Sequence, residues 1–165
     1  MHDHLAFRIE TATEAETPVI LRMIKALVDY EHLSHEFSAT ESRLREALFG
    51  NQPAAEVALA YAGTEPVGFA VYFPTFSTAP ARAGLYLEDL YVEPEWRGRG
   101  LGRRLFIHVV KVAARRGCGS VSWSVLNWNE PAMRFYRSLG AERVDDDVTF
   151  RLRGGALDRI AGEDS

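Results

Sequence analysis

A short glycine-rich segment between an expected strand and an expected helix constrains the fold of this chain more than any other feature. Residues 97–103 read Arg-Gly-Arg-Gly-Leu-Gly-Arg and follow an apolar stretch, residues 85–92, that is typical of a strand. Downstream, apolar residues recur at helical spacing, namely Leu105, Val109, Val112 and Ala113. Residues 121–126 then read as a second strand. We therefore predict a βαβ crossover at the centre of an α/β fold.

The glycine segment suits a phosphate or pyrophosphate. Glycines let backbone amides approach a ligand, and a helix N-terminus adds free N–H groups and partial positive charge. A P-loop would need a Lys-Ser or Lys-Thr pair after the glycines, and none follows. A dinucleotide fingerprint would need a different glycine spacing and an acidic residue near residues 115–120, where there is none. A surface turn rich in Gly and Arg remains an alternative.

The charge of the chain is unevenly distributed. The net charge is −4 over 165 residues, yet residues 97–116 contain seven basic residues and no acidic one, so the remaining 145 residues carry −11. An acidic protein with one basic segment indicates a specific anionic ligand rather than general adhesion to nucleic acid. The acidic remainder favours a cationic second ligand.

The remaining patterns predict one domain, residues 1–165, with a core at about 6–153 and a flexible tail at 154–165. The predicted order is βααβββαβαβ, a mixed sheet with helices on both faces. Strands are expected at residues 6–10, 57–61, 67–73, 85–92, 121–126 and 148–152. Helices are expected from Thr13 to about His32, from Ser38 or Thr40 to Gly50, from Gly102 to Gly117, and from Asn129 to Gly140. Pro74 and residues 77–84 are expected to form a loop.

Several classes of protein are disfavoured. No apolar run approaches the ~20 residues of a membrane span, and residues 1–4 lack the pattern of a secretory signal. A single cysteine, Cys118, excludes an internal disulfide and a cysteine metal cluster. Two histidine pairs have metal-like spacing but no convincing partners, so we interpret them as surface residues: His2 with His4, and His32 with His35. We expect a cytoplasmic protein with no metal, membrane or nucleic-acid partner.

Two longer stretches carry a family resemblance. Residues 86–102 resemble the central motif of the GNAT superfamily of N-acetyltransferases, whose loop [RQ]-x-x-G-x-[GA] is matched by Arg97, Gly100 and Gly102. Residues 127–141 resemble the second motif, N-x-x-A-x-x-[FL]-Y-x-x-x-G-[FA]. Residues 86–89, 128–131 and 24–31 are in addition similar to the diamine (spermidine/spermine) and thialysine N-acetyltransferases, and this resemblance runs from about Phe7 to Leu152.

The resemblance implies a GNAT-like acyl-CoA N-acyltransferase fold and a homodimer. It implies acetyl transfer from acetyl-CoA to the primary amine of a small cationic substrate. Tyr136 would donate a proton to the CoA sulfur, and Glu88 would meet the amine and deprotonate it, directly or through water. The alternatives are a core tyrosine beside Phe135 and a solvated strand carboxylate. Asp89 should point to the opposite face from Glu88 by strand alternation, unless a bulge intervenes.

The resemblance also implies a set of cofactor-binding residues. Backbone groups of Leu90, Tyr91 and Val92 would pair with the pantetheine arm, and the glycine loop would hold the pyrophosphate. The predicted cofactor-binding residues are Leu90, Tyr91, Val92, Arg97, Gly98, Arg99, Gly100, Leu101, Gly102, Arg103, Asn129 and Ala132, and Arg104 could also meet the pyrophosphate. Asn129 has a second available role as a helix N-cap.

Substrate recognition is implied for Tyr30 and Glu31, which with Glu88 would form an anionic, partly aromatic pocket. The diamine enzymes carry an aspartate in the loop after the third strand, where this chain has Ser77 or Thr78. That departure weakens the case for a long polycation and leaves room for a lysine-like amino acid. Two other functions stay open: a catalytically weak CoA-binding regulator, and an acetyltransferase of protein or peptide amines. A nucleic-acid binder is disfavoured by the total charge and by the lack of a basic, aromatic binding face.

Overall fold

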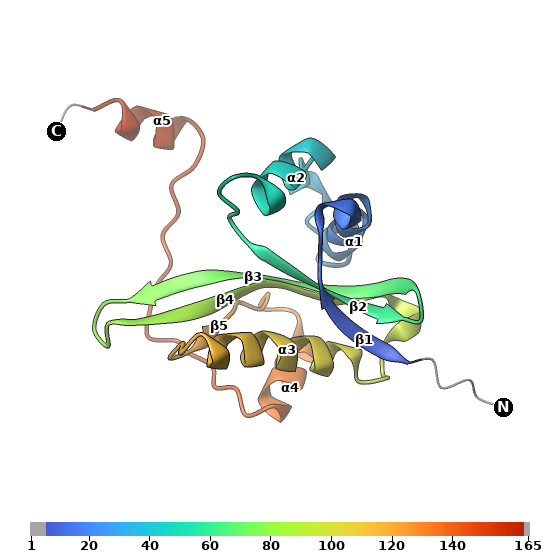
Figure 1. The fold of residues 1–165 in the computed structure, drawn as a ribbon. Coiled ribbons are helices and arrows are strands. Elements are labelled where there is room, and N and C mark those ends of the chain that lie inside the picture. The colour runs from blue at the N-terminus through green and yellow to red at the C-terminus, as the bar shows by residue number, and fades with distance from the viewer. Residues whose placement is uncertain (1–5, 164–165) are drawn as a thin grey trace. The chain divides into compact units, whose positions relative to one another are not determined.

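The sheet and its first three helices are formed by the N-terminal part of the chain. The structure is a computed structural model that describes residues 6–163, and its contacts divide the chain into two units, Met1–Leu126 and Asn127–Ser165. The first unit contains every strand and the helices α1, α2 and α3, and the second contains α4 and α5 (Figure 1).

The sheet has five strands in the order β1-β2-β3-β4-β5. Its strands are β1 (Phe7–Thr11), β2 (Glu56–Ala62), β3 (Glu65–Ser77), β4 (Arg82–Val92) and β5 (Val121–Ser122). The first four strands pair antiparallel. Strands β4 and β5 pair parallel, and α3 connects them in the sequence. This arrangement confirms the mixed sheet and the central βαβ crossover.

Helices cover both faces of this sheet (Figure 1). On one face lie α1 (Thr17–Tyr30) and α2 (Glu41–Phe49), and on the other lies α3 (Leu101–Arg115). The apolar spacing predicted for α1 places Ile20, Met23 and Leu27 in a core with Leu59 and Phe69 of the sheet. The α3 residues expected to face inward are buried, namely Leu105, Val109, Val112 and Ala113.

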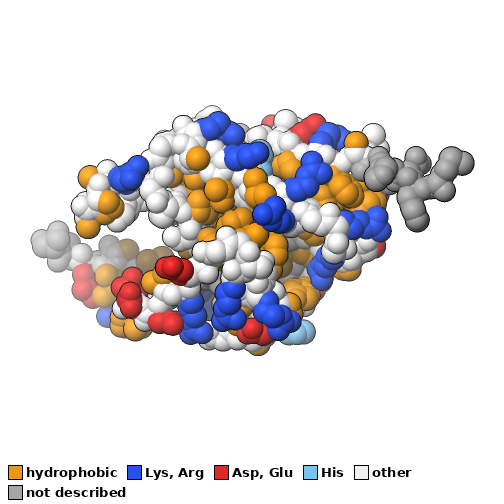
Figure 2. Space-filling model, turned by 90° about the horizontal axis from the view of Figure 1, so that it is seen from below, with side chains coloured by type: hydrophobic (Ala, Val, Ile, Leu, Met, Phe, Trp, Pro, Cys, Tyr) orange, Lys and Arg blue, Asp and Glu red, His pale blue; other side chains and the backbone are white. Residues whose placement is uncertain are grey.

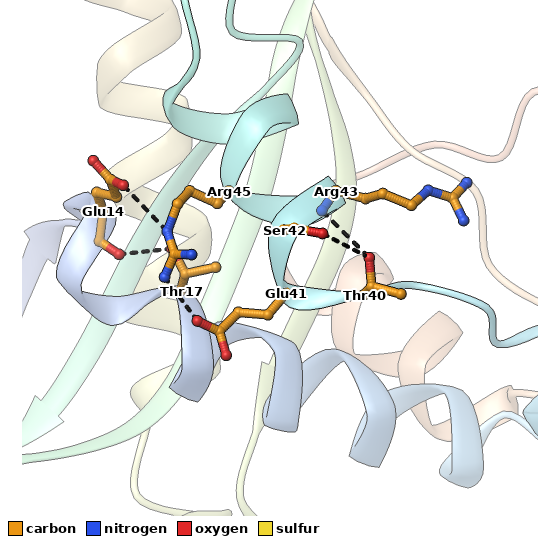
Figure 3. Close-up of polar contacts among 7 residues, drawn as sticks. All are labelled: Glu14, Thr17, Thr40, Glu41, Ser42, Arg43 and Arg45. Carbon is orange, nitrogen blue, oxygen red and sulfur yellow. Dashed lines mark hydrogen bonds and ion pairs between the residues drawn. The ribbon is translucent and has the colours of Figure 1, made fainter.

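Polar contacts fix the starts of the first two helices (Figure 3). A 3-10 turn, η1 (Glu14–Glu16), precedes α1 and begins with a capping box between Thr13 and Glu16. The hydroxyl of Thr40 accepts a hydrogen bond from the Arg43 amide at 3.3 Å and caps α2. Arg45 of α2 pairs with Glu14 and with Glu41, which ties α2 to the start of α1. Two further 3-10 turns are η2 (Ser34–Glu36) and η3 (Pro94–Trp96).

The loop predicted from Pro74 and residues 77–84 is wrong. Strand β3 continues through Ser77 and pairs with β4 as far as Arg82, so the two strands form one long hairpin. Its turn is closed by the Ala81 amide, which donates to the Thr78 carbonyl at 3.0 Å. The prediction gave Pro74 too much weight, because the aromatic residues on either side of it favour a strand.

The second unit departs further from the prediction. Helix α4 (Glu130–Ser138) ends near Gly140, as expected, but the strand predicted at residues 148–152 is absent and the segment stays unpaired. The predicted tail contains a short helix, α5 (Gly155–Ala161). Strand β5 covers only two of the six residues predicted for it. Alternation of apolar and polar residues identifies a segment that can become a strand, but a strand also needs a partner.

Candidate active site

A β-bulge in β4 sets the orientation of the predicted acceptor-site carboxylates. Opposite β3, Val71 pairs with Asp89 and the next residue, Tyr72, pairs with Leu87, so Glu88 is the extra residue of the bulge. A bulge breaks the two-residue alternation of a strand. Glu88 is exposed and Asp89 is half-buried. The bulge that would let Glu88 and Asp89 serve one site is therefore present in the backbone.

Three carboxylates act on one another at this bulge. Burial, followed by the charge of Glu88, raises the pKa of Glu31, which lies just after α1. Burial raises the pKa of Asp89 to about 7, with further contributions from the charges of Glu88 and Glu31. No Lys or Arg charge within residues 6–163 lowers the pKa of Glu31 or Asp89. Their unmatched negative charge suits a cationic ligand. Strand alternation alone predicts that Asp89 points away from Glu88, and the bulge is the exception that the sequence left open.

The buried Asp89 carboxylate predicts a pH-dependent cost to folding. Because its pKa is higher in the folded chain than the model-peptide 3.8, the folded state binds its proton more tightly. The stabilisation that the folded state gains by binding this proton is complete below about pH 4. It is lost as the pH rises through about 7. We expect Asp89→Asn to gain roughly 2–4 kcal/mol in free energy of unfolding over the parent protein at pH 8, and far less at pH 4.5. Urea titrations at both pH values measure this, with the exposed Asp146→Asn as the control; equal gains at both pH values would contradict it.

The glycine loop has the geometry that an anionic ligand needs. Gly98 and Gly100 have φ values of 73° and 79°, a region that L side chains rarely adopt, and a Cβ added at either would meet nothing within 4 Å. Gly100 is the N-cap of α3, where no side chain accepts a hydrogen bond from the first amides. Figure 2 shows Lys and Arg side chains over the face that carries α3. The loop therefore fits a pyrophosphate, with open amides and basic surroundings.

One edge of β4 is open beside this loop. Strand β5 pairs only with Leu85 and Tyr86, and no strand within residues 6–163 pairs with that edge from Leu87 to Val92. The backbone of Leu90 and Tyr91 can therefore pair with an extended ligand in the way that a further strand would. This geometry fits the predicted pantetheine contacts.

Arg97 joins the end of β4 to the end of α1. Its Nε donates to the Val92 carbonyl at 2.8 Å, and its guanidinium carbon lies 5.1 Å from the ring centre of Tyr30 and 5.5 Å from that of Tyr91. Arg99 lies 4.8 Å from the ring centre of Trp96. The cation that Tyr30 faces in this structure is thus the side chain of the predicted pyrophosphate ligand Arg97.

These contacts predict a stabilising role for Arg97. We expect Arg97→Ala to lower the free energy of unfolding by about 1–2 kcal/mol, because it removes a charge-assisted hydrogen bond and two cation–π contacts. Arg99→Ala removes one exposed contact and should cost less than about 0.5 kcal/mol. Urea denaturation of the free protein compares the two variants. If Arg97→Ala lowered the free energy of unfolding as little as Arg99→Ala is expected to, Arg97 would not stabilise this junction.

The second unit holds three predicted site residues, Asn129 at the N-cap of α4 and Ala132 and Tyr136 within that helix. The Asn129 side chain is buried and accepts a hydrogen bond from the Ala132 amide at 3.3 Å, which confirms its N-cap role. Tyr136 lies two turns further along α4, with its ring edge-on to Phe135 at 5.0 Å between centres. Asn129, Ala132 and Tyr136 belong to a different unit from the carboxylates and the glycine loop.

Within residues 6–163, no three His, Cys, Asp or Glu side chains gather so that they could hold a metal ion. His2 and His4 lie outside the described residues. No helix in the described part of the chain is long and apolar enough to span a bilayer. Arg116, one of the basic residues beyond the first turns of α3, makes two hydrogen bonds to Glu56, at 2.6 and 2.8 Å.

Comparison with known proteins decides the family. Residues 24–141 match the sequence profile of the acetyltransferase (GNAT) family, which covers more than half of the chain. The chain belongs to the GNAT family. This GNAT protein is an acetyltransferase, and members of the family use acetyl-CoA as the acetyl donor.

Relatives of this GNAT protein share nearly its whole length. The thialysine N-epsilon-acetyltransferase of Mus musculus is 36% identical over 166 residues, covering 94% of this chain and 97% of the mouse chain. The L-ornithine N5-acetyltransferase NATA1 of Arabidopsis thaliana is 28% identical, covering 93% and 87%. Among solved structures, an integron cassette protein from the mobile metagenome of V. cholerae superimposes with a TM-score of 0.80 at 24% identity, covering 95% and 98%. The last likeness confirms the α/β GNAT fold.

Proposed function

We propose that this acetyltransferase moves the acetyl group of acetyl-CoA directly to the primary amine of a small cationic substrate: a polyamine, thialysine or a lysine-like amine. The main support is the group of three carboxylates at the β4 bulge, where no Lys or Arg charge within residues 6–163 lowers the pKa of Glu31 or Asp89. The relatives that act on thialysine and ornithine support the same class of acceptor, because both are small molecules with an amine at the end of a side chain.

In this proposal the chain divides the chemistry between two substrates. Glu31, Glu88 and Asp89 hold the incoming ammonium, and Glu88 takes its proton, directly or through water. The neutral nitrogen then forms a bond to the acetyl carbon, and backbone amides of residues 90–92 stabilise the negative charge on the carbonyl oxygen. As the carbon–sulfur bond breaks, Tyr136 gives its proton to the departing thiolate, and the surplus proton on the newly acylated nitrogen restores the Tyr136 hydroxyl. The products are an acetamide and free CoA.

The same proposal assigns the donor site to the glycine loop and its neighbours. The loop amides of Gly98, Gly100 and Gly102 would bind the pyrophosphate. Leu101, Arg99 and Arg103 would complete that site, and Asn129 and Ala132 would contact the donor from α4. Arg97 supports this site by holding the end of β4, and Tyr30 supports the acceptor site through Arg97.

We also propose that the enzyme is a cytoplasmic homodimer. The support for an interface is the unpaired segment 141–153, where Val148, Phe150 and Leu152 are exposed at alternating positions. Large exposed apolar side chains in a row mark an interaction surface. Light scattering should report twice the mass of the chain for the parent protein, and a smaller mass for Phe150→Asp.

An amine panel tests the proposed function. Purified protein is given acetyl-CoA with spermidine, putrescine, thialysine, lysine or a basic peptide, and the free thiol of CoA is measured. We expect turnover with at least one small amine and weak turnover with the peptide. Binding of CoA without turnover on any amine would favour a regulatory role, and turnover on the peptide alone would favour a protein substrate.

A further inference from the structure

A hollow lies beside the proposed acceptor site and has no part in the chemistry above. It has a volume of ≈ 480 Å³ and lies between the end of α1, the turn η2 and helix α2, all within the first unit. Its walls are mostly apolar, with Val28, Leu33, Phe37 and Leu44 among them. The residues that line this hollow come from three elements and form no motif, so the sequence alone does not reveal it.

Two side chains of opposite charge stand on the walls of this hollow, Glu36 and Arg43. The Nη1 of Arg43 donates to the carbonyl of Ser38 at 3.2 Å, and Ser38 also lines the hollow, so the guanidinium is held at its wall. Figure 3 shows the Arg43 side chain leaving α2 in a different direction from Arg45, the partner of Glu14 and Glu41. No carboxylate within residues 6–163 forms an ion pair with Arg43, so four of its five N–H groups remain for a ligand.

The hollow begins within one helical turn of Glu31. Val28 and Leu33 both line it, and the Leu33 amide donates to the Val28 carbonyl at 2.9 Å across the turn that contains Glu31. Glu31 itself lies close enough to Glu88 for the two charges to act on each other. A molecule whose amine lies at the three carboxylates would have to pass Val28 to extend along the apolar walls toward Glu36 and Arg43.

We propose that this hollow receives the α-amino-acid end of a diamino acid substrate, with Arg43 binding its α-carboxylate and Glu36 its α-ammonium. A planar guanidinium can hold a carboxylate through two parallel hydrogen bonds, and apolar walls suit the methylene chain between the two ends. The inference rests on the proposed function, since it names the substrate class of the same site. It makes Arg43 the residue that selects diamino acids over plain diamines.

The test compares two acceptors that differ only in the carboxylate, lysine and cadaverine. CoA release is measured for the parent protein, for Arg43→Gln and for Arg45→Gln, a matched control on the same helix. We expect Arg43→Gln to lower kcat/KM for lysine at least about 10-fold, as loss of a charge-assisted pair predicts. Its effect on cadaverine should be far smaller, and Arg45→Gln should change neither. Turnover of cadaverine also shows that Arg43→Gln remains folded.

The outcomes separate this inference from the proposed function. If the parent protein acetylates both amines and Arg43→Gln lowers lysine and cadaverine equally, or neither, the inference is overturned. A parent protein that prefers cadaverine to lysine overturns it as well. If the parent protein releases CoA with no amine at all, the proposed function fails first.

Discussion

Replacing Tyr136 by phenylalanine is expected to lower kcat by about 10²–10⁴-fold, the usual contribution of a positioned general acid. The substitution removes one hydroxyl and keeps the aromatic ring that packs edge-on to Phe135. It leaves the N-cap of α4 untouched, because that cap uses Asn129 and Ala132. The loss should therefore appear in the chemical step, while the Kd for CoA, measured by calorimetry, stays within about twofold of the parent value.

The matched control is Tyr61→Phe in β2, which likewise removes one tyrosine hydroxyl. The ring of Tyr61 lies 4.1 Å from the guanidinium carbon of Arg8 and has no proposed part in catalysis. We expect kcat of this control to equal that of the parent. An unchanged kcat in Tyr136→Phe would exclude Tyr136 as the proton donor. A similar loss in both variants would show that tyrosine hydroxyls act here through stability.

The sequence was sufficient to predict the parts of the fold that depend on local patterns. The apolar spacing of α1 and α3 and the cap of α2, expected at Ser38 or Thr40 and found at Thr40, are each set by a few neighbouring residues. The same holds for Asn129, whose cap is made within three residues. Such features need no knowledge of distant partners.

The features that sequence analysis missed depend on pairing and on contacts between distant segments. The bulge at Glu88 is a property of the register between β3 and β4, and alternation within β4 alone cannot reveal it. Arg97 fits the pyrophosphate motif, yet its side chain contacts Tyr30, which lies 67 positions earlier in the chain. The strand predicted at residues 148–152 fails for the same reason, because alternation describes one strand and pairing requires two.

Replacing Glu88 by glutamine is expected to lower kcat/KM for the amine by about 100-fold, the low end of the range for a general base. Glutamine nearly preserves the size of the side chain at the bulge but cannot accept the ammonium proton. It also removes one of the two neighbouring negative charges that help to raise the pKa of Asp89. An ionisation of Asp89 in the pH profile of kcat/KM should consequently shift to lower pH.

Glu65→Gln is the control for this substitution, because Glu65 is exposed at the start of β3. It removes the same charge from the chain without touching the bulge, so kcat/KM and its pH profile should match those of the parent. The KM for acetyl-CoA should be unchanged in both variants, since Glu88 faces the acceptor in the proposed mechanism. If Glu88→Gln kept full kcat/KM and the ionisation of Asp89 in its pH profile did not move to lower pH, Glu88 would not be the base. If it kept the activity and showed the shift, Asp89 would be the better candidate for the base.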